Sequence, residues 1–228
     1  MSQEKQNLEQ LKTEIKVMTK IKHKNIIHMY DAMQDSKTYF LVMDYCPGGD
    51  LLDFQLTQPQ RRFSEAQAVF YLACIRDAFL CLKINQVMHR DIKLENLFID
   101  QYGELKVGDF GFAKQGNESF TKLGSHNTMA PEIFFHINNK QKKYDHKCDL
   151  WSIGVVFHIM LFGKKPYFCG VRKSDKLDLD KMNQSLINFN AHQKAFDHIS
   201  EDSAELIRRL LTKNPVFRIS EYYYLTIY

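Results

Sequence analysis

The sequence lacks the features of secreted, disulfide-rich and membrane-spanning proteins. It has five cysteines, an odd number, and no two of them have the C-x-x-C spacing of zinc and redox sites. Reduced thiols are therefore expected, which fits a cytoplasmic protein, or a nuclear one. The longest apolar run, residues 153–162, is far shorter than the roughly 20 residues that span a bilayer. Residues 1–10 are polar, so we expect no signal peptide and no membrane span.

A strong charge bias is also absent. The 228 residues carry 31 basic and 27 acidic side chains, for a net charge of +4, and the densest basic stretch, residues 140–143, is short. That stretch is interpreted as a solvated loop, so no nucleic-acid partner is expected. Hydrophobic residues make up 44% of the chain and charged residues 25%, the ordinary balance of a globular protein. The length suits one large domain, or two small domains joined by a hinge.

The spacing of apolar residues near the N-terminus predicts one helix and two strands. Apolar residues recur at three- and four-residue steps from Leu8 to Met18, which predicts an amphipathic helix over residues 4–22. Two short strands are predicted next, over residues 26–33 and 38–43, joined by a polar turn.

The remainder of the chain is predicted to be mostly helical. The segment Cys46-Pro47-Gly48-Gly49 ends the second strand before a helical stretch, which predicts a hinge between two parts of the chain. Ser64 opens a long helix that ends near Asn85, and Gln67 completes a capping box with Ser64. Further helices at 148–162, 180–188 and 202–211, with a β-hairpin at 97–107, complete a predicted α+β chain.

Three short motifs follow one another in the middle of the chain. They are His89-Arg90-Asp91-Ile92-Lys93-Leu94-Glu95-Asn96, then Asp109-Phe110-Gly111, then Ala130-Pro131-Glu132. Each alone is weak evidence, but together, in this order and with a hairpin between the first two, they resemble the protein kinase family. The resemblance covers residues 8–220. It implies a protein-kinase-like α+β fold, with a partial small N-terminal lobe over residues 1–45 and a large helical C-terminal lobe over residues 46–228.

The resemblance implies an ATP-dependent enzyme that transfers the γ-phosphate to Ser or Thr hydroxyls of a protein substrate, with Mg²⁺ bound. Such transfer requires the protein mainly to position groups and to neutralise charge. Asp91 is then the catalytic carboxylate that orients or accepts the hydroxyl proton, and Lys93 places a positive charge near the phosphate. Asn96 and Asp109 offer the hard oxygen ligands that Mg²⁺ prefers. A lysine two residues after the catalytic aspartate is also typical of kinases that modify Ser or Thr.

The same resemblance implies a nucleotide site. Met43 matches the residue behind the adenine pocket, residues 44–46 match the hinge whose main chain binds adenine, and Phe98 matches the pocket floor. For Met43 and Phe98 the alternative is plain core packing. Glu14 matches the glutamate that pairs with an ATP-holding lysine, and its alternative is a solvated helix charge. The full set of expected nucleotide-binding residues is Met43, Asp44, Cys46, Asp50, Lys93, Glu95, Asn96, Phe98 and Asp109.

Other matches to the family are structural. Glu132 and Arg218 are expected to form a buried ion pair, and Asp149 is expected to hold the main chain of the catalytic loop. The resemblance also implies an apolar stack that aligns the lobes. Its four expected members are Met18, Met29, His89 and Phe110.

One expected regulatory site lies between the second and third motifs. Thr121 is the expected activating phosphosite, with Ser119 as the second choice, and Arg90 is the expected partner of the phosphate. Glu14 is a further expected regulatory residue, through the ion pair with an ATP-holding lysine that the resemblance implies. An upstream activating kinase is accordingly a candidate partner, beside the protein substrate.

The chain also departs from the family pattern. No G-x-G-x-x-G loop and no Val-Ala-Ile-Lys strand precedes the first predicted helix. Roughly 25–40 residues in three strands would supply them, so residues 1–228 by themselves are expected to be truncated and weak or inactive. A kinase-like protein-binding module without catalysis is the alternative function. Within the family, residues 124–133 and 149–157 resemble the autophagy-initiating (Unc-51-like) branch, with the calcium/calmodulin-dependent group as a rival.

Overall fold

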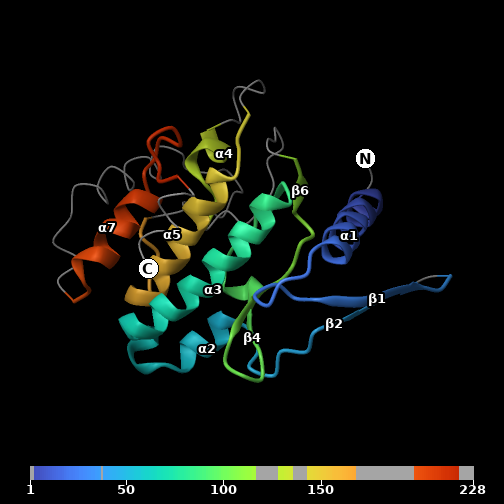
Figure 1. The fold of residues 1–228 in the computed structure, drawn as a ribbon, viewed down its shortest axis with the longest axis horizontal. Helices are drawn as coiled ribbons and strands as arrows, with labels where there is room; N and C mark the ends of the chain where they lie inside the picture. The colour runs from blue at the N-terminus through green and yellow to red at the C-terminus, as the bar shows by residue number, and fades with distance from the viewer. Residues whose placement is uncertain (1–2, 37, 117–127, 136–142, 168–197, 221–228) are drawn as a thin grey trace.

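The computed structural model describes residues 3–36, 38–116, 128–135, 143–167 and 198–220 (Figure 1). These residues form a small part, with one helix and a two-stranded sheet, and a larger part that is mostly helical. This is the α+β arrangement of a small and a large part that the sequence predicts. The helix predicted over residues 180–188 lies outside the described residues.

The elements follow the predicted order closely. In chain order they are α1 Gln3–Lys20, β1 Met29–Gln34, β2 Tyr39–Met43, α2 Leu51–Thr57, the 3-10 turn η1 Pro59–Arg61, α3 Glu65–Ile84, β3 Val87–Met88, the 3-10 turn η2 Leu94–Asn96, β4 Leu97–Ile99, β5 Leu105–Val107, β6 Lys114–Gln115, α4 Pro131–Phe135, α5 Lys147–Phe162 and α7 Glu201–Leu210. The strands pair antiparallel as β1–β2, β3–β6 and β4–β5.

The strand β1 begins later than the sequence predicts, because the residues before it pair elsewhere. Ile27 N donates to Val107 O, and Val107 N donates to Asn25 O, both at 2.9 Å. Ile26 thereby forms a parallel bridge with Val107 of β5. These bonds join the small part of the fold to the β4–β5 hairpin, so the segment that looked like the start of a strand is the link between the two parts.

The long helix α3 begins at the capping box that the sequence predicts. Gln67 N donates to Ser64 Oγ at 3.3 Å, and Ser64 N donates to Gln67 Oε1 at 3.2 Å. Two of the main-chain N–H groups that a helix start leaves unpaired are thus satisfied by neighbouring side chains.

The core of the larger part is built around α5, which lies between α3 and α7 in Figure 1. Helix α5 is apolar on all sides, and 13 of its 16 residues are buried. A helix of this kind is stable only when other elements cover it entirely. No helix among the described residues is both long and apolar enough to cross a membrane. The four described cysteines are free thiols, and Cys169 lies outside the described residues.

Gly154 sits at the closest approach between α5 and α7. A Cβ atom placed on Gly154 would lie 2.7 Å from Leu210 Cβ, closer than two carbon atoms can pack. Gly154→Ala is therefore expected to lower the free energy of unfolding by about 1–3 kcal/mol, the usual cost of overpacking a core. Urea denaturation measures this loss. If overlap is the cause, the loss must shrink in a Leu210→Gly background, because glycine lacks the Cβ atom that the new methyl group would meet. An equal loss in both backgrounds would contradict this account.

Candidate active site

The catalytic loop forms a hydrogen-bonded network around Asp91. The Asp91 carboxylate accepts hydrogen bonds from Lys93 Nζ at 2.8 Å and from Asn96 Nδ2 at 3.0 Å. Asn96 Nδ2 also donates to the main-chain oxygen of Asp91 at 2.9 Å. The Asp91 side chain is fully buried whereas that of Lys93 is 22% exposed, so the lysine is the solvent-facing member of the pair. The two residues predicted to be catalytic are thus in direct contact.

Asp149 fixes the main chain at the start of this loop, as predicted. Its carboxylate oxygens accept hydrogen bonds from His89 N at 2.9 Å and from Arg90 N at 2.8 Å. Arg90 has a φ of +68°, a left-handed conformation that is strained for a residue with a side chain. The two charge-assisted bonds from Asp149 offset this strain. The catalytic loop therefore depends on a residue of α5 for its shape.

His89 connects the catalytic loop to the segment that carries Asp109. Its Nδ1 accepts a hydrogen bond from Asp91 N at 3.2 Å, so the ring proton lies on Nε2, which bonds Gly108 O at 3.0 Å. The His89 ring also packs on Phe110, with centroids 4.9 Å apart. Of the predicted apolar stack, Met18, Met29, His89 and Phe110 are all buried.

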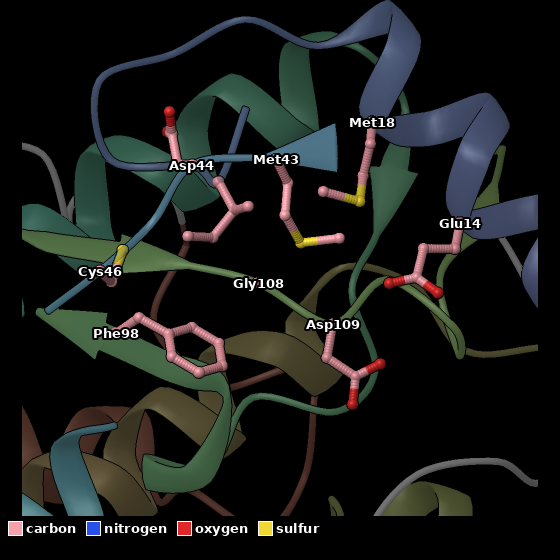
Figure 2. A pocket seen from close by; sticks show the side chains of 9 residues that line it. Glu14, Met18, Met43, Asp44, Cys46, Phe98, Gly108 and Asp109 are labelled. Carbon is pink, nitrogen blue, oxygen red and sulfur yellow. The ribbon is translucent and has the colours of Figure 1, made fainter. Parts of the chain in front are cut away.

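Asn96 and Asp109, the two predicted metal ligands, flank the β4–β5 hairpin in the sequence, so both lie at its open end. Gly108 N donates to Asn96 O at 2.9 Å, which brings the two ends together. Because Asn96 Nδ2 is bonded to Asp91, its Oδ1 is the atom left to bind a cation. Asp109 is one of the residues that line the neighbouring cavity (Figure 2). No cluster of three or more metal-ligating His, Cys, Asp or Glu side chains exists among the described residues.

A cavity of about 350 Å³ opens between the small part of the fold and the β4–β5 hairpin (Figure 2). Its volume lies in the usual range of small-molecule sites. Four predicted nucleotide-binding residues besides Asp109 line it. The complete lining is Glu14, Met18, Ile27, Met43, Asp44, Cys46, Phe98, Gly108 and Asp109.

The main chain of residues 44–46 forms one wall of this cavity. Asp44 N donates to His28 O at 2.9 Å, and Cys46 O accepts from Gly49 N at 3.1 Å. Within the described part of the chain, Asp44 C=O and Cys46 N–H have no hydrogen-bond partner. One acceptor and one donor are therefore available to a planar heterocycle. Burial raises the pKa of the Cys46 thiol, which keeps this side chain neutral and adds apolar surface to the wall.

Glu14 projects from α1 into the far end of the cavity, toward Asp109 (Figure 2). Burial raises the pKa of its carboxyl, the nearby Asp109 raises it further, and a hydrogen bond from the main chain of Phe110 partly opposes both. Among the described residues no basic side chain forms an ion pair with Glu14. The solvated helix charge that was its alternative does not describe this position.

The remaining predicted site residues lie outside the cavity. Asp50 caps α2, where its Oδ1 accepts from Asp53 N at 2.9 Å, and Glu95 is exposed on the 3-10 turn η2. Arg90 donates through Nε to Phe112 O at 2.7 Å, and through the terminal nitrogens to Tyr144 and Ala113. Thr121 and Ser119 lie outside the described residues, so the phosphosite stays a prediction.

The Glu132–Arg218 ion pair is present as predicted. The two guanidinium nitrogens of Arg218 donate to the two carboxylate oxygens of Glu132 at 2.6 and 2.8 Å. The side chain of Arg218 is fully buried and that of Glu132 is 9% exposed. Arg218 also lies over the ring of Trp151, 5.1 Å from its centroid. The pair joins α4 to the segment after α7.

A comparison with family models decides the identity of the fold. Residues 1–226 match the model of the protein kinase domain. The chain belongs to the protein kinase family. The match includes the catalytic loop, the Asp-Phe-Gly triplet and the Ala-Pro-Glu triplet, in agreement with the resemblance that these motifs indicated.

Several curated kinases are similar to this chain over most of its length. Calcium-dependent protein kinase 3 of Plasmodium berghei is 35% identical over 221 residues, which cover 94% of this chain and 38% of that protein. Aurora kinase A-B of Xenopus laevis is 31% identical over 212 residues, 92% of this chain and 48% of that protein. cAMP-dependent protein kinase type 3 of Saccharomyces cerevisiae is 32% identical over 208 residues, 91% of this chain and 48% of that protein. The chain thus spans less than half the length of these relatives, and their different names leave its subfamily a prediction.

The sequence reasoning missed the residues that surround the hinge of this kinase domain. Asp44 accepts hydrogen bonds from His28 N at 3.0 Å and Tyr30 Oη at 2.8 Å, and it forms an ion pair with Lys106 at 3.3 Å. Partial burial by itself would raise the pKa of Asp44, but these three donors together lower it. No local signal could have revealed this cluster, because its members come from distant parts of the sequence.

Proposed function

We propose that this chain is the catalytic part of an ATP-dependent Ser/Thr protein kinase. The observation that supports this most strongly is the contact of Lys93 Nζ and Asn96 Nδ2 with the Asp91 carboxylate, beside the cavity that Asp109 lines. A buried carboxylate with a cation next to it suits the proton of an attacking hydroxyl and the charge of a transferring phosphate. The Asp-x-Lys spacing supports Ser or Thr as the acceptor.

The residues present fit ATP and Mg²⁺. Asp44 C=O and Cys46 N–H, which have no hydrogen-bond partner among the described residues, suit the edge of adenine. Met43 and Phe98 provide apolar surface for its faces. Asn96 Oδ1 and the Asp109 carboxylate would hold Mg²⁺, which when bound neutralises phosphate charge. Asp50 and Glu95 would take part only at the rim, since neither lines the cavity.

The remaining expectations are part of the same proposal. We infer a boundary between the two lobes at residues 45 and 46, in the hinge segment that follows the end of β2 at Met43. The proposed partners are a protein substrate with a Ser or Thr acceptor and an upstream kinase acting on Thr121. The proposed compartment is the cytoplasm or the nucleus.

A binding module without catalysis is the second candidate function. It is favoured by Glu14, which has no basic partner among the described residues. Phosphate transfer to a generic Ser/Thr peptide in the presence of Mg²⁺ and ATP separates the two candidates, because a binding module transfers none.

The metal assignment can be tested by binding alone. The ATP affinity of the wild-type chain is expected to rise about tenfold or more when Mg²⁺ is added, and Asp109→Asn is expected to abolish this increase, because the amide removes the anionic ligand. Calorimetric titration with ATP, with and without Mg²⁺, measures the effect. The affinity for adenosine, which has no phosphate, should be the same in both proteins. Asp202→Asn, an exposed change on α7, is the matched control. A Mg²⁺ effect that survives Asp109→Asn would refute the assignment.

A further inference from the structure

The side chain of Asp44 occupies a different side of the hinge from the nucleotide cavity. Asp44 lines the cavity, yet Figure 2 shows its carboxylate turned away from the space between Met43, Phe98 and Asp109. The part of Asp44 that faces the cavity is therefore its main chain. Its carboxylate instead meets three donors, two from the segment 28–30 and one from β5.

Those three donors are His28 N–H, the Tyr30 hydroxyl and the Lys106 ammonium group. They bond Asp44 at 3.0, 2.8 and 3.3 Å respectively. The Lys106 and Asp44 side chains are only 17% and 16% exposed, so solvent screens their attraction less than that of a surface pair. We call Asp44, His28, Tyr30 and Lys106 the hinge cluster.

The hinge cluster joins both parts of the fold to the hinge. Tyr30 belongs to β1 of the small part, and Lys106 belongs to β5 of the larger part. Lys106 Nζ also donates to Lys24 O at 2.9 Å, in the segment that follows α1. The main chain of residue 44 is held as well, because Asp44 N donates to His28 O. With both its amide and its carboxylate bonded, residue 44 has little freedom to rotate.

We propose that Asp44 is a positioning residue for nucleotide binding: the hinge cluster holds its main chain so that Asp44 C=O and Cys46 N–H face the cavity. This inference rests on the proposed function, since it takes adenine as the group that meets those two atoms. Preorganised groups bind more tightly because the ordering is already present before the ligand arrives. In this arrangement the side chain of Asp44 does not contact the nucleotide.

The test compares variants of the 228-residue chain in two measurements. Lys106→Met and Tyr30→Phe each remove one donor, and Asp44→Ala removes the acceptor of all three. The exposed residues Lys22 and Tyr102 provide matched controls as Lys22→Met and Tyr102→Phe. Thermal unfolding identifies any variant that fails to fold, and the two single-donor variants then carry the test.

The first measurement, NMR relaxation and hydrogen exchange of the Asp44 and Cys46 amides without ligand, reads the order of the hinge. The second is the dissociation constant for adenosine, read from the shift of the Cys46 amide signal. Lys106→Met is expected to increase exchange at both amides and to weaken adenosine about tenfold, the effect of one hydrogen bond to a charged group. Lys106→Arg is expected to restore both values, and the controls are expected to match the wild type.

The outcomes separate this inference from the proposed function. Unchanged amide exchange and unchanged adenosine affinity in Lys106→Met and Asp44→Ala would overturn the positioning role. If Lys106→Met increases amide exchange but the wild-type chain binds no adenosine, the cluster holds the hinge and the proposed nucleotide site is wrong. A general loss of affinity in the control variants would also overturn the positioning role.

Discussion

Asp91→Asn is expected to lower phosphate transfer by about 10²–10⁴-fold, the contribution of a positioned acid–base group, while the protein stays folded. The carboxylate of Asp91 accepts hydrogen bonds from Lys93 and Asn96, and the loop that carries it is shaped by Asp149. Asparagine keeps the size of the side chain but cannot accept a proton from a hydroxyl. Lys93 is partly exposed, so its charge reaches water when its partner is neutralised.

Single-turnover transfer from radiolabelled ATP to a Ser/Thr peptide measures this effect, in a catalytically active form of the protein. Thermal unfolding of the same preparation checks the fold. Asp53→Asn, an exposed change on α2, is the matched control and should transfer phosphate at the parental rate. Transfer by Asp91→Asn within tenfold of the parent would show that another group handles the proton.

Glu132→Ala is expected to lower the free energy of unfolding by about 3–5 kcal/mol, the cost of removing one partner of a buried ion pair. Arg218 has a fully buried side chain, and besides Glu132 it donates to Thr212 O at 3.0 Å and Lys147 O at 2.6 Å. Without the carboxylate, a buried cation remains with only carbonyl oxygens and the Trp151 ring around it. This loss of stability should be larger than the loss caused by removing any exposed charge.

Urea denaturation of Glu132→Ala, Arg218→Met and the double variant measures the coupling between the two residues. The double variant is expected to lose less stability than the sum of the two single losses, because neither charge is then left without its partner. Glu9→Ala is the matched control, because it breaks an exposed pair with Lys12 and should change stability little. Additive losses would mean that the pair contributes nothing beyond its separate packing.

The catalytic residues could be predicted because they lie close together in the sequence. Asp91, Lys93 and Asn96 fall within six residues, so one short loop brings them into contact. Asp109 follows after a short hairpin whose turn is local as well. The capping box that begins α3 is a local pattern of the same kind, formed by Ser64 and Gln67. In each of these cases the partners are near one another before the rest of the chain folds.

The pairs predicted across long distances depended on the resemblance rather than on any local pattern. Glu132 and Arg218 are 86 positions apart, and Asp149 lies 60 positions from His89. Neither spacing carries a helical or strand period that would bring the partners together. Glu14 shows the same limit, because its sequence surroundings describe an exposed helix charge, whereas the structure directs it toward Asp109.

The sequence by itself determined the catalytic loop, the order of the elements and the membership of the kinase family, because these depend on short-range spacing and on residue types with few alternative uses. Only the tertiary structure decided the start of β1 and the hinge cluster. The same holds for the main-chain groups of Asp44 and Cys46 that have no hydrogen-bond partner in the described part of the chain. Residues 25–27 pair with Val107 instead of extending a strand, and Lys106 reaches Asp44 from the opposite side of the hinge. Such contacts form where distant segments of the chain pack together, so no single segment of the sequence predicts them.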